Sequence, residues 1–395
     1  MTFFNKIKQI LFTSGSLQRI KPTVTGFGTI NPVWLTSSNV ALLSIYTGIT
    51  EINSMVDEIA ELASSIELGL YKKNNKGDEI EITDHWVLDS LKMPNPIQDG
   101  KLFRKTNAIF YLTLGNSFIN KVDANLPKAI NKVELWVLPA QYLQIVTEDP
   151  FDSVDYRLNK INRYELNTGC KLTFSPDEII HIKDVNVNFD NGQYLLGYGN
   201  LALSIKSNTS LSSIHDAIVS MFQKRGALGI ISSKDSQFPL SGDEAKDLKQ
   251  KYFEEYGLHA NKSSILITTG NVEYTQMAMD LMQLQSLENK KDAIIAIANR
   301  YRYPLPLIFN DAATYNNMDT ARKYLYTNAV IPLLKTECAA YNKGFNLEKE
   351  GLYFRPKLES ISELKEDEMQ KEILLQGRLD RGIISIPEYR KAIGL

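Results

Sequence analysis

The sequence predicts an α+β protein in which two long helices accompany a strand-rich region. Apolar residues recur at three- and four-residue steps through residues 281–302, which predicts an amphipathic helix about 33 Å long. Residues 200–225 repeat such a pattern with a wider apolar surface interleaved with serine, which predicts a helix packed between neighbours. Residues 117–185 instead contain short β-forming runs separated by Asn, Asp, Gly and Pro, as in a small mixed domain.

The length and the composition restrict the class of protein. A chain of 395 residues exceeds the size at which one hydrophobic core stops growing, so two or more domains are expected. Hydrophobic residues make up 43% and charged residues 23%, as in ordinary globular proteins. The net charge of −2 argues against a protein that grips DNA tightly, because phosphate neutralisation requires a basic surplus.

Cysteine usage and hydropathy restrict it further. Cys170 and Cys338 are too few for a disulfide framework or a structural zinc site, so both are predicted to be buried thiols in a reducing cytosol. We expect no signal peptide, because Lys6 and Lys8 interrupt the first apolar pattern. No run of eighteen uncharged apolar residues occurs, so no membrane partner is expected.

Residues 1–33 are predicted to be an N-terminal arm and linker. Phe3, Phe4, Ile7 and Leu11 can share one face of a short helix, which we expect to pack on a neighbouring surface. Gly15–Pro32 is rich in Gly, Ser, Thr and Pro, as linkers are.

Helices and a hairpin are predicted to follow the linker. Ser38–Leu70 is strongly helical, and its core-facing stripe consists of Ile52, Val56, Ile59, Leu62, Ala63 and Ile66. The segment Leu68–Thr83 is predicted to be a hairpin that turns at Asn74–Gly77, with a half-buried second strand. Phe103–Leu114 is predicted to be a further helix.

Seven short strands are predicted in the β-rich region. They are Phe118–Val122, Val133–Leu138, Gln144–Val146, Tyr156–Leu158, Tyr164–Leu166, Lys171–Phe174 and Ile179–Ile182. His181 lies in the last of these strands and is predicted to be structural, since no nucleophile on an elbow-like turn accompanies it. The acids of residues 148–155 lack the spacing of a calcium loop, so we interpret them as a solvated loop. No catalytic residue, metal site or cofactor is predicted.

The segment between the two long helices, residues 226–279, carries mixed signals. Leu228–Ser232 is predicted to be a strand, and Ser241–Tyr256 a helix that a capping box begins. Ser264–Thr268 and Val272–Met277 are predicted to form a hairpin that turns at Gly270-Asn271.

The second long helix ends at a proline-bounded turn. Pro304 and Pro306 cannot continue a helix, and a polar, turn-prone segment follows them. Asp319 is predicted to cap a helix that begins near Thr320 and continues to Gly344, with a kink or break near Val330 because Pro332 lies inside it.

The C-terminal residues are predicted to be mostly helical. Gly351–Pro356 is predicted to be a short strand. Ser362–Leu395 is predicted to form two or three amphipathic helices with turns at Gly377 and Gly382.

Two signatures together carry a resemblance to a known family. The first is a long helix, the "YPLPLIF" turn of Tyr303–Phe309, a polar loop and the "MDTARKYLYTNAVIPLL" helix. The second is His85, Leu88 and Leu91 before Pro94-Asn95-Pro96, followed by Gly115-Asn116-Ser117-Phe118. In this order and spacing, from about Trp34 onward, the chain resembles the portal proteins of tailed bacteriophages, most closely the short portals of long-tailed phages. Family members usually have "VPPHLLG" in the turn and "GNAY" in the second signature, so this sequence departs from both.

The resemblance implies a division of the chain into named parts. These are an arm and linker (1–33), a wing (34–199 and 320–358), two antiparallel stem helices (200–225 and 280–302), a clip (226–279), a tunnel loop (303–319) and a short helical crown (359–395). Within this segment, the residues of the tunnel loop are expected to be Asn310, Asp311, Ala312, Ala313, Thr314, Tyr315, Asn316 and Asn317.

The resemblance also implies a function. Portals form a ring, expected here to be a dodecamer, at one capsid vertex, and double-stranded DNA is packaged and ejected through its channel. The implied partners are the terminase large subunit, a head–tail adaptor, and the major capsid and scaffold proteins. The implied location is the virion, with the host cytoplasm during assembly.

Arg300, Arg302, Arg322 and Lys323 are the cations nearest the loop in sequence. They are candidates either for DNA contact or for salt bridges between subunits, since exposed arginines readily pair with carboxylates.

Two other functions remain open. One is a different head–tail adaptor or collar protein. The other is an enzyme acting on nucleic acid, which is disfavoured because no GxxxxGK[ST] loop occurs and the acids of residues 148–155 make a poor metal site.

Overall fold

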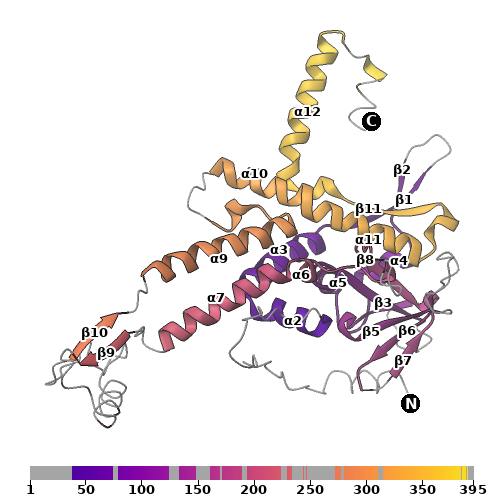
Figure 1. The fold of residues 1–395 in the computed structure, drawn as a ribbon. Helices are drawn as coiled ribbons and strands as arrows, with labels where there is room; N and C mark the ends of the chain where they lie inside the picture. The colour runs from indigo at the N-terminus through magenta and orange to yellow at the C-terminus, as the bar shows by residue number, and fades with distance from the viewer. Residues whose placement is uncertain are drawn as a thin grey trace. The chain divides into compact units, whose positions relative to one another are not determined.

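The computed structural model describes residues 38–73, 79–123, 133–147, 161–169, 171–188, 194–223, 229–233, 243, 246, 272–276, 280–309, 315–383, 385–387 and 389. The chain divides into two units (Figure 1). The larger unit consists of Met1–Ile205 and Ile297–Leu395, and the smaller unit is Lys206–Ala296. The smaller unit is therefore an insertion in the sequence of the larger one. Helices and strands are both present, which confirms the predicted α+β class.

The first helical segment is two helices, α2 (Asn39–Gly48) and α3 (Thr50–Ser65), and the prediction of one continuous helix to Leu70 is wrong. Ile49 separates them with an extended backbone, and its side chain is buried. The predicted core stripe of α3 is largely correct, because Ile52, Val56 and Ile59 are fully buried. Helix α3 packs against α5 (Gly100–Leu114), which begins three residues before its predicted start at Phe103.

One sheet joins distant parts of the chain. Strand β1 (Leu68–Lys73) lies between β2 (Glu79–Ile82) and β11 (Leu352–Pro356), and both pairings are antiparallel. The predicted hairpin is confirmed in its strands, while its turn lies outside the described residues. Its second strand is not half-buried as predicted, because Ile80 is 51% exposed and only Ile82 is partly covered.

Two further antiparallel sheets lie in the predicted β-rich region. Strand β3 (Asn116–Asp123) is flanked by β4 (Val133–Leu138) and β8 (Ile179–Lys183). Strand β6 (Ile161–Asn167) is flanked by β5 (Leu143–Thr147) and β7 (Lys171–Phe174). Six of the seven predicted strands are confirmed, and the seventh, Tyr156–Leu158, lies outside the described residues.

The main core lies between α11 (Ile331–Gly344) and two of the sheets. Helix α11 contacts β11 of the β11-β1-β2 sheet and β8 of the β4-β3-β8 sheet (Figure 1). Helices α4 (Trp86–Lys92) and α5 contribute to the same core. The fully buried members of this cluster are Leu70, Val87, Phe103, Ile119, Leu135, Ile180, Tyr341 and Leu347. Cys338 also lies in it, and burial raises the pKa of its thiol to about 12. The predicted burial of Cys338 is thus confirmed, while Cys170 is not among the described residues.

The Gly115-Asn116 pair of the second signature fixes the start of β3. Gly115 ends α5 with φ 73°, and a Cβ there would lie 2.6 Å from the carbonyl carbon of Tyr198, so glycine is required. The Asn116 amide donates to the carbonyls of Leu114 (3.0 Å) and Gly197 (2.8 Å). This signature therefore joins the α5–β3 turn to the segment that precedes α6 (Asn200–Leu203).

A buried ion pair ties three helices together. Arg104 of α5 donates to both carboxylate oxygens of Glu337 of α11, each at 2.9 Å. The same guanidinium donates to the carbonyls of Ala63 and Ile66 at the end of α3. Burial would lower the pKa of Arg104, but the Glu337 carboxylate raises it above its usual value. The pair thus satisfies the last carbonyls of α3 and fixes α5 to α11.

The predicted helix of residues 200–225 is interrupted, and its form as one helix is wrong. Helix α6 (Asn200–Leu203) is followed by Ser204 and then by α7 (Ile205–Gln223). The Ser204 hydroxyl donates to the Asn200 carbonyl at 2.8 Å. The Ser204 backbone, with φ −97° and ψ 17°, departs from the helical conformation and separates the two helices.

The smaller unit contains α7, the strands β9 (Gly229–Ser233) and β10 (Val272–Gln276), and the first part of α9 (Asp280–Tyr301). Strand β10 pairs antiparallel with β9, a partner that the sequence does not predict. The predicted partner, Ser264–Thr268, lies outside the described residues, as does most of the predicted helix Ser241–Tyr256.

Helix α12 (Ser362–Asp380) follows β11 and runs through Gly377, so the turn predicted there is wrong. The turn at Gly382 is confirmed by its positive φ of 69°. Short 3-10 helices also occur in the described part of the chain, among them Ala140–Tyr142, Pro176–Glu178, Leu305–Leu307, Leu347–Glu350 and Leu358–Ser360. Within the described residues, no helix combines the length and the apolar character that crossing a membrane requires.

Candidate functional site

The candidate site is the segment that leads from the end of α9 into α10 (Tyr315–Leu325). Helix α9 ends in a closed turn, in which the amide of Tyr303 donates to the Ala298 carbonyl at 2.8 Å and the amide of Arg302 to the Asn299 carbonyl at 3.1 Å. This is the Schellman arrangement, whose left-handed position is usually a glycine. Here Arg302 occupies that position with φ 54°.

Two tyrosines fix this turn to the helical layer below it. The Tyr301 hydroxyl donates to the Leu112 carbonyl of α5 at 3.4 Å, and the Tyr303 hydroxyl donates to the Glu58 carboxylate of α3. Both rings are buried, and burial raises the pKa of both hydroxyls, with the Glu58 carboxylate adding to the shift at Tyr303. The chain therefore leaves α9 from a point that two helices hold.

The predicted tunnel loop, Asn310–Asn317, is partly helical. Residues 310–314 lie outside the described part of the chain, whereas Tyr315, Asn316 and Asn317 form the first turn of α10. The prediction that Asp319 caps a helix beginning near Thr320 is wrong, because Asp319 lies within α10. The helix extends toward its N-terminus because Ala321 and Leu325, both buried, belong to a stripe that already includes the partly buried Met318.

Helix α10 continues into a π-helical turn, Tyr326–Val330, and then into α11. The predicted break near Val330 is thus confirmed, and Pro332 accounts for it. Pro332 has no N–H, so the Asn328 carbonyl cannot receive an α-helical hydrogen bond from the residue four positions on. Arg302 donates to that carbonyl through Nη1 at 3.2 Å.

The sequence does not predict that Arg302 contacts the π-helical turn. It does predict that the Asn328 carbonyl needs another donor, because Pro332, four residues later, has no N–H. The link joins the residue that enters the loop segment to the helix that follows it.

The four predicted cations have different surroundings. Arg300 lies 3.9 Å from the Asp184 carboxylate, and Arg302 is bonded to Asn328. Arg322 is exposed on α10, and Lys323 beside it is partly buried. The structure therefore gives the two arginines of the α9 end partners within their own chain.

No group of three His, Cys, Asp or Glu side chains is placed to hold a metal ion among the described residues, and the acidic stretch 148–155 is not part of them. His181 is enclosed between Phe118, whose ring centroid lies 4.3 Å away, and Asn116, whose Oδ1 lies 3.0 Å from Nε2. Burial lowers the pKa of His181 to about 3, so the ring is neutral at ordinary pH. These surroundings are those of a structural histidine, as predicted.

Comparisons with known proteins find similar sequences and similar folds. Two uncharacterized proteins are similar in sequence. One of Rickettsia felis is 26% identical over 82% of this chain and 80% of its own length. One of Rickettsia bellii is 25% identical over 86% of this chain and 85% of its own length.

Among solved structures, the neck of an empty GTA particle has a TM-score of 0.66 at 21% identity, over 92% of this chain and 95% of that one. A portal protein of the HK97 phage family from Corynebacterium diphtheriae has a TM-score of 0.55 at 13% identity. The match covers 84% of this chain and 99% of that one. The family model described as "Phage portal protein" matches residues 50–394. The chain belongs to the phage portal protein family.

Proposed function

We propose that copies of this chain form a ring at one vertex of a phage capsid, and that double-stranded DNA enters and leaves the particle through the channel of this ring. A portal and head–tail connector role follows from the family, whose model covers nearly the whole chain. That match is the observation that carries the proposal. One copy has no pore, so the function requires a closed ring with head-to-tail interfaces.

The proposed tunnel loop is Asn310–Asn317. The geometry supports this choice because the chain enters the loop from a turn held by Tyr301 and Tyr303 and leaves it into α10. Loops that a rigid scaffold holds at both ends commonly carry the function of a protein. In the proposed ring this loop lies in the channel, beside the passing duplex.

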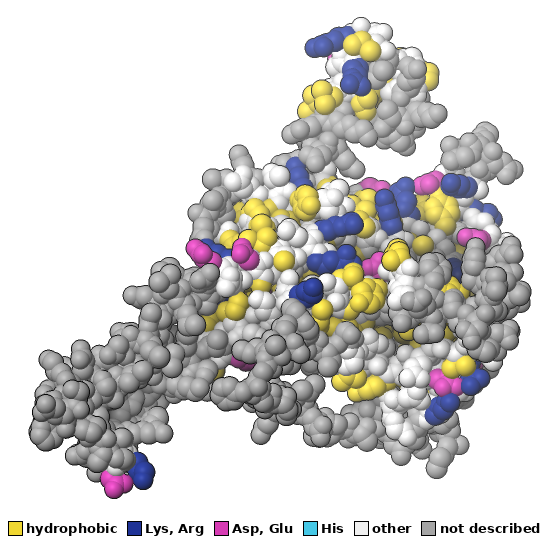
Figure 2. All heavy atoms as spheres, in the orientation of Figure 1, with side chains coloured by type: hydrophobic (Ala, Val, Ile, Leu, Met, Phe, Trp, Pro, Cys, Tyr) yellow, Lys and Arg dark blue, Asp and Glu magenta, His cyan; other side chains and the backbone are white. Residues whose placement is uncertain are grey.

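Among the four candidate cations, we propose that Arg322, which is exposed on α10, guides the DNA. Arg300 and Arg302 already contact Asp184 and Asn328 of the same chain. Figure 2 shows Lys and Arg side chains on the face over helices α10 and α11. A few weak phosphate contacts suit a sliding duplex, whereas a strongly basic wall would retain it.

The proposed ring is a dodecamer. The similar neck of the native GTA particle was computed with C12 symmetry, and another match is to the virion of that particle. By resemblance to the family, we propose the terminase large subunit, a head–tail adaptor, and the major capsid and scaffold proteins as partners. The proposed location is the capsid vertex, with assembly in the host cytoplasm.

Native mass spectrometry and negative-stain microscopy of the purified full chain test the ring. We expect a particle of twelve times the 44.7 kDa of one chain, with a central channel. A protein that stays monomeric at every concentration, and in assembled particles as well, contradicts the proposal. An ATPase assay on the same sample tests the enzymatic alternative, and we expect no turnover above background.

A further inference from the structure

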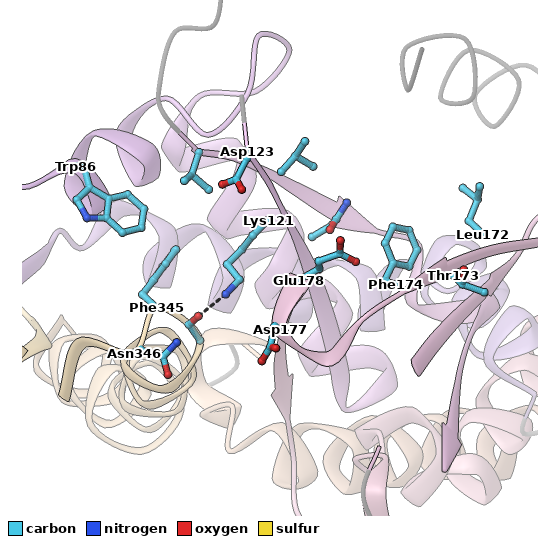
Figure 3. Close-up of a pocket in the computed structure, with 14 residues that line it drawn as sticks. Trp86, Lys121, Asp123, Leu172, Thr173, Phe174, Asp177, Glu178, Phe345 and Asn346 are labelled. Carbon is cyan, nitrogen blue, oxygen red and sulfur yellow. Dashed lines mark hydrogen bonds between the residues drawn. The ribbon is translucent and has the colours of Figure 1, made fainter. Parts of the chain in front are cut away.

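A cavity of about 680 Å³ opens on the larger unit, between α4, the β3–β4 edge, the β7–β8 connection and the turn after α11 (Figure 3). Its walls combine aromatic and acidic side chains. The proposed channel function does not use this cavity. Its volume lies within the range of sites that hold a ligand or several side chains of a partner.

Carboxylates outnumber cations in this cavity. Asp123, Asp177 and Glu178 surround Lys121 (Figure 3). The Lys121 ammonium donates to the Gly344 carbonyl at 2.6 Å, and the Glu178 carboxylate accepts from the Ser175 amide at 2.8 Å. Asp123 and Asp177 are exposed and make no hydrogen bond or ion pair of their own with any other described residue. An anionic ligand would be repelled here, and a cationic one attracted.

The aromatic side chains suit the same kind of ligand. Trp86 is 38% exposed, and its indole packs against the edge of Phe345 with the ring centroids 5.8 Å apart. A partly exposed indole can contact a Lys or Arg side chain through its face and can also cover an apolar ring. The cavity is therefore suited to a basic segment that also carries apolar side chains.

The N-terminal arm of this protein has that composition. Residues 1–33 contain Lys6, Lys8, Arg19 and Lys21 and no acidic residue, although acids slightly outnumber bases in the whole chain. Phe3 and Phe4 add aromatic rings beside the first lysines. Residues 1–37 can span up to about 120 Å when extended.

We propose that this cavity is the docking site for the basic N-terminal arm of a neighbouring copy of the same chain. The inference rests on the proposed ring, in which each copy must offer two different and complementary surfaces to its neighbours. The arm and the cavity are such a pair. Each copy donates its arm on one side and receives another on the other side, so the contact repeats around the ring.

Carbodiimide cross-linking of the assembled full-length protein tests this directly. The reagent couples lysine amines to carboxylates in contact, so Lys6, Lys8 or Lys21 should be joined to Asp123, Asp177 or Glu178 in peptides identified by mass spectrometry. Rings assembled from equal amounts of ¹⁴N- and ¹⁵N-labelled chains should give cross-linked peptides of mixed isotope content. Peptides of a single isotope content only would show docking within one copy and overturn the proposal, as would arm lysines joined only to other carboxylates.

A second measurement uses limited trypsin digestion, because trypsin cleaves after Lys6, Lys8 and Arg19 of the arm. We expect the variant Asp123→Asn/Asp177→Asn to lose its arm at least fivefold faster than the unmodified protein. The matched control is Asp216→Asn/Asp380→Asn, which neutralises two exposed carboxylates outside the cavity and should leave the rate unchanged. Equal cleavage rates for both variants would overturn the proposal.

Native mass spectrometry of the same samples separates the two proposals. Rings without cavity cross-links contradict the arm docking alone. An absence of rings under every condition contradicts the proposed function itself.

Discussion

Arg302 holds a backbone conformation that costs a non-glycine residue about 1–2 kcal/mol, and its side chain supplies a hydrogen bond that Pro332 cannot. Replacing Arg302 with alanine keeps the strained backbone and removes the bond, so we expect the free energy of unfolding to fall by about 1 kcal/mol. Arg302→Gly removes the bond and the strain together, and should restore most of that loss. Thermal denaturation of the purified variants measures both changes.

A double-mutant cycle provides the control. In a Pro332→Ala background, the restored N–H can serve the Asn328 carbonyl, so Arg302→Ala should cost less than in the natural sequence. An equal cost in both backgrounds would mean that the hydrogen bond to Asn328 does not account for the role of Arg302.

His181 provides a pH-dependent prediction at the same scale. Its pKa is lowered to about 3 by burial, against about 6.5 in an unfolded chain, so the unfolded state binds more protons between these values. The contribution of His181 to the free energy of unfolding is therefore fully present above about pH 6.5. It falls as the pH drops toward 3, by up to about 1.4 kcal/mol per pH unit. Equilibrium unfolding across this range should show a shallower pH slope for His181→Gln, and an unchanged slope would contradict the assignment.

The two residues differ in how far the sequence could predict them. Alternation along Ile179–Lys183 places His181 in a strand, and the absence of a nucleophile makes it structural. Nothing around Arg302 indicates a left-handed backbone, because the residue type that marks this position is glycine. Its role depends on a carbonyl 26 residues away in the chain.

At the scale of elements, the Arg104–Glu337 pair makes the sharpest prediction. Glu337→Gln leaves a buried guanidinium without a charged partner, so we expect a loss of about 3–5 kcal/mol in the free energy of unfolding. Chemical denaturation measures it. The expected effect is larger than for exposed pairs such as Lys101–Glu61, where Glu61→Gln should cost under about 1 kcal/mol.

Replacing both partners tests whether the loss comes from the unpaired charge. The variant Arg104→Met/Glu337→Leu should be more stable than Glu337→Gln alone. If the double variant is the less stable of the two, the carbonyls of Ala63 and Ile66, rather than the ion pair, account for most of the effect.

Positions of elements were more predictable than their partners. The strands of the β-rich region follow from alternation and turn residues, which are local properties, and most boundaries agree within two residues. The pairing of β10 with β9 and of β1 with β11 depends on contacts that no local pattern contains. The breaks at Ile49 and Ser204 were missed because one residue outside the helical conformation suffices to separate two helical patterns.

For the whole molecule, the loop can be separated from assembly. Replacing Asp311–Thr314 with four Gly/Ser residues leaves α10 and the anchored turn in place, so we expect rings of unchanged mass and thermal stability but particles that retain less DNA. Native mass spectrometry and the DNA content of particles assembled with the variant provide the two measurements. A failure to form rings would make this segment a structural joint. The ring itself was predicted from the resemblance alone, since the sequence of one copy contains no pattern for symmetry.

The place of β11 beside β1 has a consequence for how the protein is made. A ribosome synthesises β1 long before its partner strand, because residues 74–351 lie between the two strands in the chain. Nascent chains therefore expose an incomplete sheet until β11 has emerged and can pair with β1.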